Sequence, residues 1–418
     1  MHQTDSINFK KIFQKEIKTI PKKEIKRINN KQYSKHLITD TVSIKSREQY
    51  FAMASISTYP IINGVKQGEP NCDRAGIVRF DNATFIALAD GCGWGDKPSF
   101  AAKLAVTSSL EFVISSITTI STLRESASLL VETIANANQI ICSSHPNNNA
   151  QTTLLVALSF SLIDDQQVTV VLSIGDCRLF HYSLRECKVK KIIGTGHHSI
   201  DETKECIAAL GNNQLRTDII NGSQLAVCEC EEGDLIFAVT DGVYDNFDPI
   251  IIKEKKPYDQ LINEILGIRI KRSANLNSLV EELCSYIIEI TQTVREFHQN
   301  NPTKRRRDGL PGKLDHSTII VYSINTQNVD IGLIDKYTPE LFKTLKPLET
   351  KKPLVHSISF DEQNPPLMPL LSDPVRNTKN SSKISIHSVR LNTFSPPRTA
   401  LNDHYTPCLT PRIYRDVV

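Results

Sequence analysis

Two apolar runs of this 418-residue chain end with the same pair, an aspartate followed by a glycine. The first run precedes Asp90-Gly91 and the second precedes Asp241-Gly242. A carboxylate at the mouth of a buried strand needs a compensating partner, and a metal ion is one of the few effective ones. Asp-Gly is also a common turn sequence, so one occurrence is weak evidence. Its repetition after a second apolar run favours a shared site.

Other aspartates occupy similar places at the ends or edges of predicted strands. They are Asp73, Asp176, Asp245 and Asp315. Any one of them is explained equally well by a helix cap or a turn, and only their joint placement favours a site. If the strands share one sandwich, their ends meet at one mouth, where clustered carboxylates cannot all ionise without cations. Oxygen ligands without histidine or cysteine favour Mg²⁺ or Mn²⁺ over Zn²⁺, and two such ions can clamp a phosphate.

The elements that must position these aspartates are mostly short strands. Apolar periodicity predicts helices over residues 99–117 and 123–143, and a helical stretch with interruptions over residues 258–297. Strand patterns occupy most of the remaining chain between residues 50 and 325. Because helices do not separate the strands one by one, a doubly wound parallel sheet fits poorly. We therefore predict an α+β fold, a β-sandwich of two antiparallel sheets with helices packed outside.

Composition divides the chain into three parts. Residues 1–48 are rich in lysine, which predicts a basic N-terminal extension, either a solvated arm or an amphipathic helix. Residues 49–326 form the predicted folded domain. Residues 327–418 are rich in Pro, Ser, Thr and Asn and lack apolar periodicity, which predicts a largely disordered Ser/Pro-rich tail.

Overall composition narrows the classes of partner and compartment. A formal net charge of +3 is too small to favour nucleic acid or a membrane surface as a partner. No apolar run approaches the ~18 residues of a transmembrane helix, and no signal sequence is evident. The ten cysteines form no CxxC pair, which predicts reduced intracellular thiols. We expect a cytoplasmic protein, with the nucleus as the alternative, and the sequence predicts no oligomeric state.

Five short motifs containing these aspartates occur in order along the chain. They are Asn71-Cys72-Asp73, Ala89-Asp90-Gly91-Cys92-Gly93, Gly175-Asp176-Cys177-Arg178, Thr240-Asp241-Gly242-Val243-Tyr244-Asp245 and Gly312-Lys313-Leu314-Asp315-His316-Ser317-Thr318. In order, spacing and strand context they resemble the PPM (PP2C-type) family of metal-dependent protein serine/threonine phosphatases, over roughly residues 50–325. The family fold is a sandwich of two antiparallel sheets flanked by helices, in four αββα layers, and it matches the predicted elements.

The resemblance implies hydrolysis of phosphoserine and phosphothreonine in phosphoprotein substrates. A hydroxide that bridges two Mg²⁺ or Mn²⁺ ions would attack the phosphorus directly, without a covalent phosphoenzyme. The resemblance assigns Asp90, Asp241 and Asp315 to the first ion, as the catalytic aspartates. It assigns Asp90 and the carbonyl of Gly91 to the second ion.

A weaker third metal site occurs in some members of the family. The resemblance assigns Asp176, Asp241 and Asp245 to this third site. It also includes Asp73 in the metal-binding set.

The chain departs from the family pattern at three positions beside the site. Cys72 stands where the family usually has Glu, and Cys92 stands where it often has His. The phosphate-binding Arg has no counterpart, since Gly68 stands near its place with Lys66 as a substitute. The departures support an alternative, a weak or inactive pseudophosphatase that acts as a binding or regulatory module. A third alternative is a phosphatase for a different phosphorylated ligand. Trp94, which is unusual beside such a site, is either a packing anchor or a wall of the substrate cleft.

Overall fold

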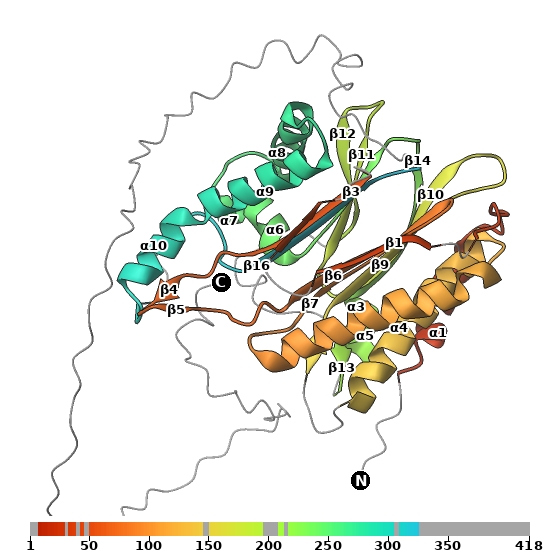
Figure 1. Cartoon of the computed structure of the whole chain (residues 1–418), viewed down its shortest axis with the longest axis horizontal. Coiled ribbons are helices and arrows are strands. Elements are labelled where there is room, and N and C mark those ends of the chain that lie inside the picture. The colour runs from red at the N-terminus through yellow and green to blue at the C-terminus, as the bar shows by residue number, and fades with distance from the viewer. Residues whose placement is uncertain are drawn as a thin grey trace, which may run out of the picture. The chain divides into compact units, whose positions relative to one another are not determined.

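Two six-stranded antiparallel sheets stack against each other at the centre of the structure (Figure 1). The computed structural model describes residues 7–29, 32–38, 42–45, 50–144, 150–194, 208–212, 216–304 and 309–325. The first sheet runs in the order β1 (Gln32–Ile38), β6 (Asp73–Phe80), β7 (Ala83–Asp90), β9 (Leu154–Ser161), β10 (Gln167–Ile174) and β14 (Ser223–Cys230). The second runs in the order β12 (Lys188–Ile193), β11 (Arg178–Ser183), β15 (Leu235–Val239), β16 (His316–Ser323), β3 (Phe51–Ser57) and β2 (Val42–Lys45).

Two small pairs of strands complete the β structure that the model describes. They are β4 (Ile61–Ile62) with β5 (Val65–Lys66), and β8 (Gln151–Thr152) with β13 (Leu210–Gly211). Every strand pair is antiparallel, as the sequence predicted.

Helices cover the outer face of each sheet (Figure 1). On the first sheet lie α3 (Asp96–Ser116) and α4 (Leu123–Ser144), with α1 (Phe9–Ile12) and α2 (Gln14–Thr19) against α4. On the second lie α8 (Tyr258–Arg272) and α9 (Leu276–Ile290). Shorter helices are α5 (Arg216–Asn221), α6 (Asp241–Tyr244), α7 (Pro249–Ile252), α10 (Gln292–Asn300) and the 3₁₀ turns Ile117–Thr119 and Asp245–Phe247. The predicted α+β fold class, a sandwich of two antiparallel sheets flanked by helices, is confirmed.

Alternation along the strands separates the core into layers. In β7, Phe85 and Ala87 face the helices, whereas Ile86 and Leu88 pack between the two sheets. Because side chains of a strand alternate between its faces, Asp90 continues the side of Ile86 and Leu88. The last residue of β7 therefore points toward the space between the sheets, at their open end.

The N-terminal segment contributes to both sheets, so the folded part begins earlier than the boundary predicted at residue 49. β1 pairs with β6, and β2 pairs with β3. Phe9, Phe13 and Ile28 are buried in the core that α3 and α4 share with the first sheet. The lysines between these apolar residues gave the segment the composition of a solvated extension, although its apolar residues are the ones that pack. The predicted tail, residues 327–418, lies outside the described residues.

One helical stretch of the described chain, Asp96–Thr119, is long and apolar enough by composition to cross a membrane. Half of its most apolar window is buried in the fold, where α3 packs against β6, β7 and α4. Core helices commonly share this composition. The stretch is therefore explained by its place in the core.

The buried N-terminal segment predicts a stability effect at Phe13, whose side chain is 3% exposed. Phe13→Ala should lower the free energy of unfolding of the full chain by about 3 kcal/mol, because it leaves a cavity in the core. Urea denaturation followed by circular dichroism measures the change. Lys15→Ala, at an exposed position of the same segment, is the matched control. Equal stability of the two variants would show that the segment does not pack on the domain.

Candidate metal centre

The aspartates of the first sheet meet the second sheet at one end of the sandwich. Asp73 and Asp90 stand opposite each other in the β6–β7 pair. Thr240, directly after β15 of the other sheet, donates a hydrogen bond from Oγ1 to Asp73 Oδ2 at 2.9 Å. The backbone of Asp90 is held by Thr153, whose Oγ1 accepts from the Asp90 N–H at 2.9 Å. The two sheets thus share a carboxylate site at this end.

The aspartates of the second sheet join the same site. Asp241 opens α6, Asp245 follows one turn later, and Asp315 directly precedes β16, the neighbour of β15. Asp176, in the turn between β10 and β11, interacts electrostatically with Asp241 and Asp245. Asp90 interacts in the same way with Asp73, Asp241 and Asp315. The structure therefore brings together all the aspartates that the sequence indicated.

A lysine that the sequence pattern did not single out lies among these carboxylates. The Nζ atom of Lys313 is 2.5 Å from Asp241 Oδ2, 3.0 Å from Asp245 Oδ2 and 3.1 Å from Asp315 Oδ2. Its side chain is 1% exposed. One sequence signal could have found it: Lys313 precedes Asp315 by two residues, and residues so spaced share one side of an extended segment.

Burial and mutual repulsion oppose the simultaneous ionisation of these carboxyl groups. Burial raises the pKa of Asp73, Asp176 and Asp315 to about 7 each, and neighbouring carboxylates add to the effect. Burial and the charges of Asp73, Asp241 and Asp315 raise the pKa of Asp90 well above its usual value. Burial acts against ionisation of Asp241 as well, but Lys313 and a hydrogen bond from Asp90 hold its pKa below the usual value.

The donor chemistry of the cluster fits hard divalent cations. It consists of carboxylate oxygens, the ligands that Mg²⁺ and Mn²⁺ prefer, and one ammonium does not offset the charge of six carboxyl groups. The positions of these side chains relative to one another, however, do not form a metal site. Among the described residues, no three His, Cys, Asp or Glu side chains are grouped as they stand to hold a metal ion. The cluster is thus chemically suited to a metal, while Lys313 lies where its carboxylates converge.

Tyr59 fixes Asp315 from the side opposite Lys313. The Tyr59 hydroxyl donates to Asp315 Oδ1 at 2.9 Å and accepts from Trp94 Nε1 at 2.9 Å. The same Asp315 oxygen also accepts the backbone N–H of His316. Trp94 and Leu314 pack with Tyr59 in one apolar cluster. Of the two roles considered for Trp94, these contacts are those of a packing anchor.

Tyr59 packs against Gly68, the residue near which the sequence resemblance would place a phosphate-binding arginine. Gly68 has a φ of +75°, and a Cβ added there would lie 2.3 Å from the Tyr59 ring. A larger residue at position 68 therefore requires Tyr59 to move. Lys66, the suggested substitute, donates to the carbonyl oxygens of Ser57 and Tyr59, at 3.2 and 2.5 Å. Its ammonium is bound to the backbone of the neighbouring segment.

The thiol of Cys72 lies in the family's glutamate position but offers no carboxylate. It donates to the carbonyl oxygens of Pro70 and Gly95, at 3.3 and 3.6 Å. Burial raises its pKa to about 12, so it stays protonated.

Gly91 is closely packed, since a Cβ there would lie 2.6 Å from the Pro98 carbonyl. Cys92 donates its backbone N–H to the Gln151 carbonyl at 3.0 Å.

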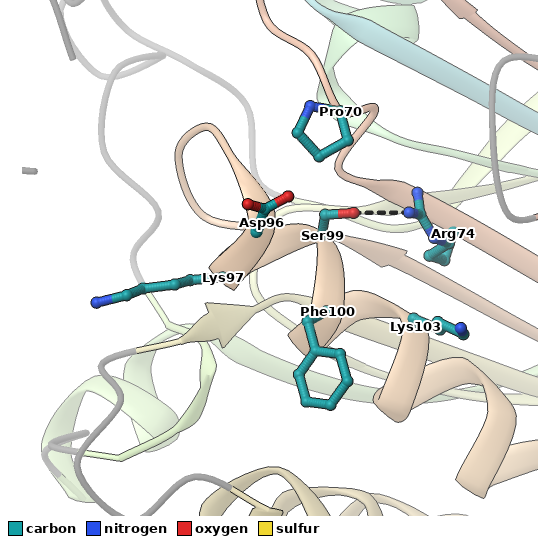
Figure 2. A pocket seen from close by; sticks show the side chains of 7 residues that line it. All are labelled: Pro70, Arg74, Asp96, Lys97, Ser99, Phe100 and Lys103. Carbon is teal, nitrogen blue, oxygen red and sulfur yellow. Dashed lines mark hydrogen bonds between the residues drawn. The ribbon is translucent and has the colours of Figure 1, made fainter.

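A basic pocket of about 450 Å³ lies between the first turns of α3 and Arg74 of β6 (Figure 2). Arg74 lines it from β6 and donates from Nη2 to Ser99 Oγ of α3 at 2.6 Å. The exposed Lys97 and Lys103 line it as well, against one carboxylate, Asp96. The pocket thus carries an excess of positive charge.

Comparison with known proteins points to one family. The model of the family described as "Protein phosphatase 2C" matches residues 64–284. The chain is 26% identical over 209 residues to the "PP2C-like domain-containing protein CG9801" of Drosophila melanogaster, a match that covers 48% of this chain and 29% of that protein. The chain thus spans under a third of the length of this relative.

Solved structures of low sequence identity were also found. The Mycobacterium tuberculosis serine/threonine phosphatase PstP/Ppp is 15% identical and has a TM-score of 0.41, over 66% of this chain and 99% of that one. A complex of the PstP catalytic domain with two manganese ions is 16% identical and has a TM-score of 0.40, over 65% of this chain and 97% of that one.

The raised pKa of Asp73 predicts how the stability of the metal-free chain depends on pH. The folded-state pKa, about 7, exceeds the usual ~3.9 of an unfolded chain, so the folded state retains the proton between these values. The resulting stabilisation is complete below about pH 4 and is lost as pH rises through about 7. Asp73→Asn removes this loss. The variant should gain about 2 kcal/mol of unfolding free energy over wild type between pH 5 and pH 8.

Thermal or urea denaturation in the presence of a chelator, at both pH values, measures this difference. Asp164→Asn, at an exposed turn between β9 and β10, is the control and should follow wild type at both pH values. A stability difference between Asp73→Asn and wild type that is the same at pH 5 and pH 8 would contradict the prediction.

Proposed function

Because the chain belongs to the protein phosphatase 2C family, we propose that it is a metal-dependent protein serine/threonine phosphatase with the aspartate cluster as its active site. One observation carries the proposal. Aspartates from five separate motifs converge at the end of the sandwich, where they share electrostatic and hydrogen-bonding partners. Burying so many carboxylates together is costly unless cations bind them. A cluster of buried carboxylates lowers the stability of the fold, so stability alone does not explain the presence of these aspartates.

The proposed ligands follow the family pattern. Asp90, Asp241 and Asp315 would hold one Mg²⁺ or Mn²⁺ ion, and Asp90 with the Gly91 carbonyl would hold another. When bound, such ions neutralise phosphate oxygens and lower the pKa of water, which makes water a nucleophile at neutral pH. A weaker third ion would use Asp176, Asp241 and Asp245.

The chain's own residues orient this site. Thr240 bonds Asp73, Tyr59 bonds Asp315, and Thr153 holds the backbone of Asp90. Groups held in this way keep their positions when charge develops on a substrate. The proposed metal-binding residues are Asp73, Asp90, Gly91, Asp176, Asp241, Asp245 and Asp315.

A phosphoprotein is the proposed substrate. The basic pocket at the start of α3 supports this choice, because Arg74, Lys97 and Lys103 would attract a segment that carries acidic or phosphorylated residues. The pocket would contribute to substrate binding and not to the hydrolysis step, since the aspartates of the cluster do not line it.

A second candidate is a non-catalytic member of the family that acts as a binding or regulatory module. The protonated thiol of Cys72 and the Tyr59 ring over Gly68 favour it, because both stand where the family places groups that support catalysis. The two candidates differ in one measurable property, metal-dependent turnover.

The phosphatase proposal predicts loss of activity at Asp241. Wild type should hydrolyse p-nitrophenyl phosphate and a phosphothreonine peptide in the presence of Mn²⁺. Asp241→Asn should lower kcat/KM by about 100-fold or more, because it removes a charged ligand shared by two proposed metal sites. Asp164→Asn should leave the rate unchanged. If wild type shows no metal-dependent turnover, the chain is the non-catalytic member.

The position of Cys72 yields a gain-of-function prediction. Cys72→Glu should raise the Mn²⁺-dependent rate several-fold, because a carboxylate there adds negative charge and an oxygen acceptor beside the second proposed ion. Cys72→Ser, which adds an oxygen acceptor but no negative charge, is the matched control. Equal rates for the two variants would show that this position does not limit activity.

A further inference from the structure

The backbone at Lys313 is clamped, so its side chain is directed into the site. Asn246 Oδ1 accepts the Lys313 N–H at 2.8 Å, and Asn246 Nδ2 donates to the Lys313 carbonyl at 3.0 Å. The next residue, Leu314, is fully buried. These contacts do not involve the carboxylates, so the direction of the lysine is set by packing and by hydrogen bonds of the main chain.

The ammonium of Lys313 lies among three carboxylates. An ammonium has three N–H donors and no acceptor. Its Nζ donates a hydrogen bond to Asp241 Oδ2 at 2.5 Å and lies 3.0 Å from Asp245 Oδ2 and 3.1 Å from Asp315 Oδ2, and the side chain is 1% exposed. The lysine thus places one positive charge among these carboxylates.

A divalent ion and this ammonium need the same ligands. Asp241 and Asp315 belong to the first proposed metal site, and Asp241 and Asp245 to the third. A cation bound at about 2.0–2.2 Å from these oxygens would lie within roughly 5 Å of the lysine nitrogen. Cations so close in a buried site repel each other strongly. The two cannot share the three carboxylates in the observed arrangement.

Asp315 has few free oxygen lone pairs with which to bind a metal ion and the Lys313 ammonium at the same time. Its Oδ1 already accepts hydrogen bonds from the Tyr59 hydroxyl and the His316 N–H, and its Oδ2 faces Lys313. The ion pairs found for Lys313 in the described chain do not extend to Asp73 or Asp90. The lysine therefore engages only the Asp241, Asp245 and Asp315 part of the cluster.

We propose that Lys313 is a built-in cation that competes with divalent metal ions for Asp241, Asp245 and Asp315. A metal enters this part of the site only when the ammonium leaves it. The inference rests on the metal site of the proposed function but not on hydrolysis.

Metal binding by variants of Lys313 tests the competition. Isothermal titration of the metal-free full chain with Mn²⁺ compares wild type with Lys313→Ser and Lys313→Gln. Each variant should bind one more equivalent of Mn²⁺ than wild type, or the same number at least tenfold more tightly. Lys188→Ser, at an exposed position of β12, is the matched control and should bind as wild type does. The Gln variant keeps the length of the side chain and an N–H donor if the Ser variant does not fold.

A second measurement uses wild type alone. In ¹⁵N-lysine-labelled protein, the buried Lys313 ammonium should give a slowly exchanging NMR signal that is absent from Lys313→Gln. Titration with diamagnetic Mg²⁺ to millimolar concentration should shift or remove this signal. If the Lys313 signal stays unchanged when Mg²⁺ saturates the metal sites, the proposal is overturned.

The outcomes separate this inference from the phosphatase proposal. Equal Mn²⁺ binding by wild type and both Lys313 variants overturns the inference, even if wild type hydrolyses phosphate. Tighter Mn²⁺ binding by the variants without turnover in any of the proteins supports the inference and removes the phosphatase proposal. Tighter binding together with turnover in wild type supports both.

Discussion

The concentration of carboxylates at one end of the sandwich is the constraint on which the site depends. Asp73 and Asp90 come from the first sheet, and Asp241 and Asp315 from the second, so folding itself forces like charges together. Each sheet supplies its aspartates at the point where an apolar strand ends. The surrounding threonines and Tyr59 satisfy individual oxygens, but hydrogen bonds from neutral groups do not neutralise the total charge.

Two kinds of cation can provide that neutralisation, and the structure contains one of them. Lys313 brings a positive charge within hydrogen-bonding distance of three carboxylates. A tethered ammonium differs from a metal ion in two physical respects. It has a single charge and cannot polarise water as a divalent ion does.

The residues around the cluster form a connected, hydrogen-bonded set. Tyr59 covers Gly68, bonds Asp315 and accepts from Trp94, while the thiol of Cys72 bonds nearby carbonyl groups. Each replacement is packed and hydrogen-bonded, so the site is well ordered without the family's arginine and glutamate. This order is compatible with altered catalysis and with a purely binding role, which is why turnover is the property that separates the two candidates.

The sequence by itself determined most strands after residue 50, the main helices and the aspartates at strand ends, because these depend on local periodicity and on residues close in the chain. Alternation along β7 even determined that Asp90 shares a side with Ile86 and Leu88. Only the tertiary structure decided which strands are neighbours. That choice placed the N-terminal strands β1 and β2 in the sheets, against the prediction from their lysine-rich composition. It also brought Lys313 to Asp241 and Tyr59 to Asp315, contacts between residues far apart in the chain, which no local pattern encodes.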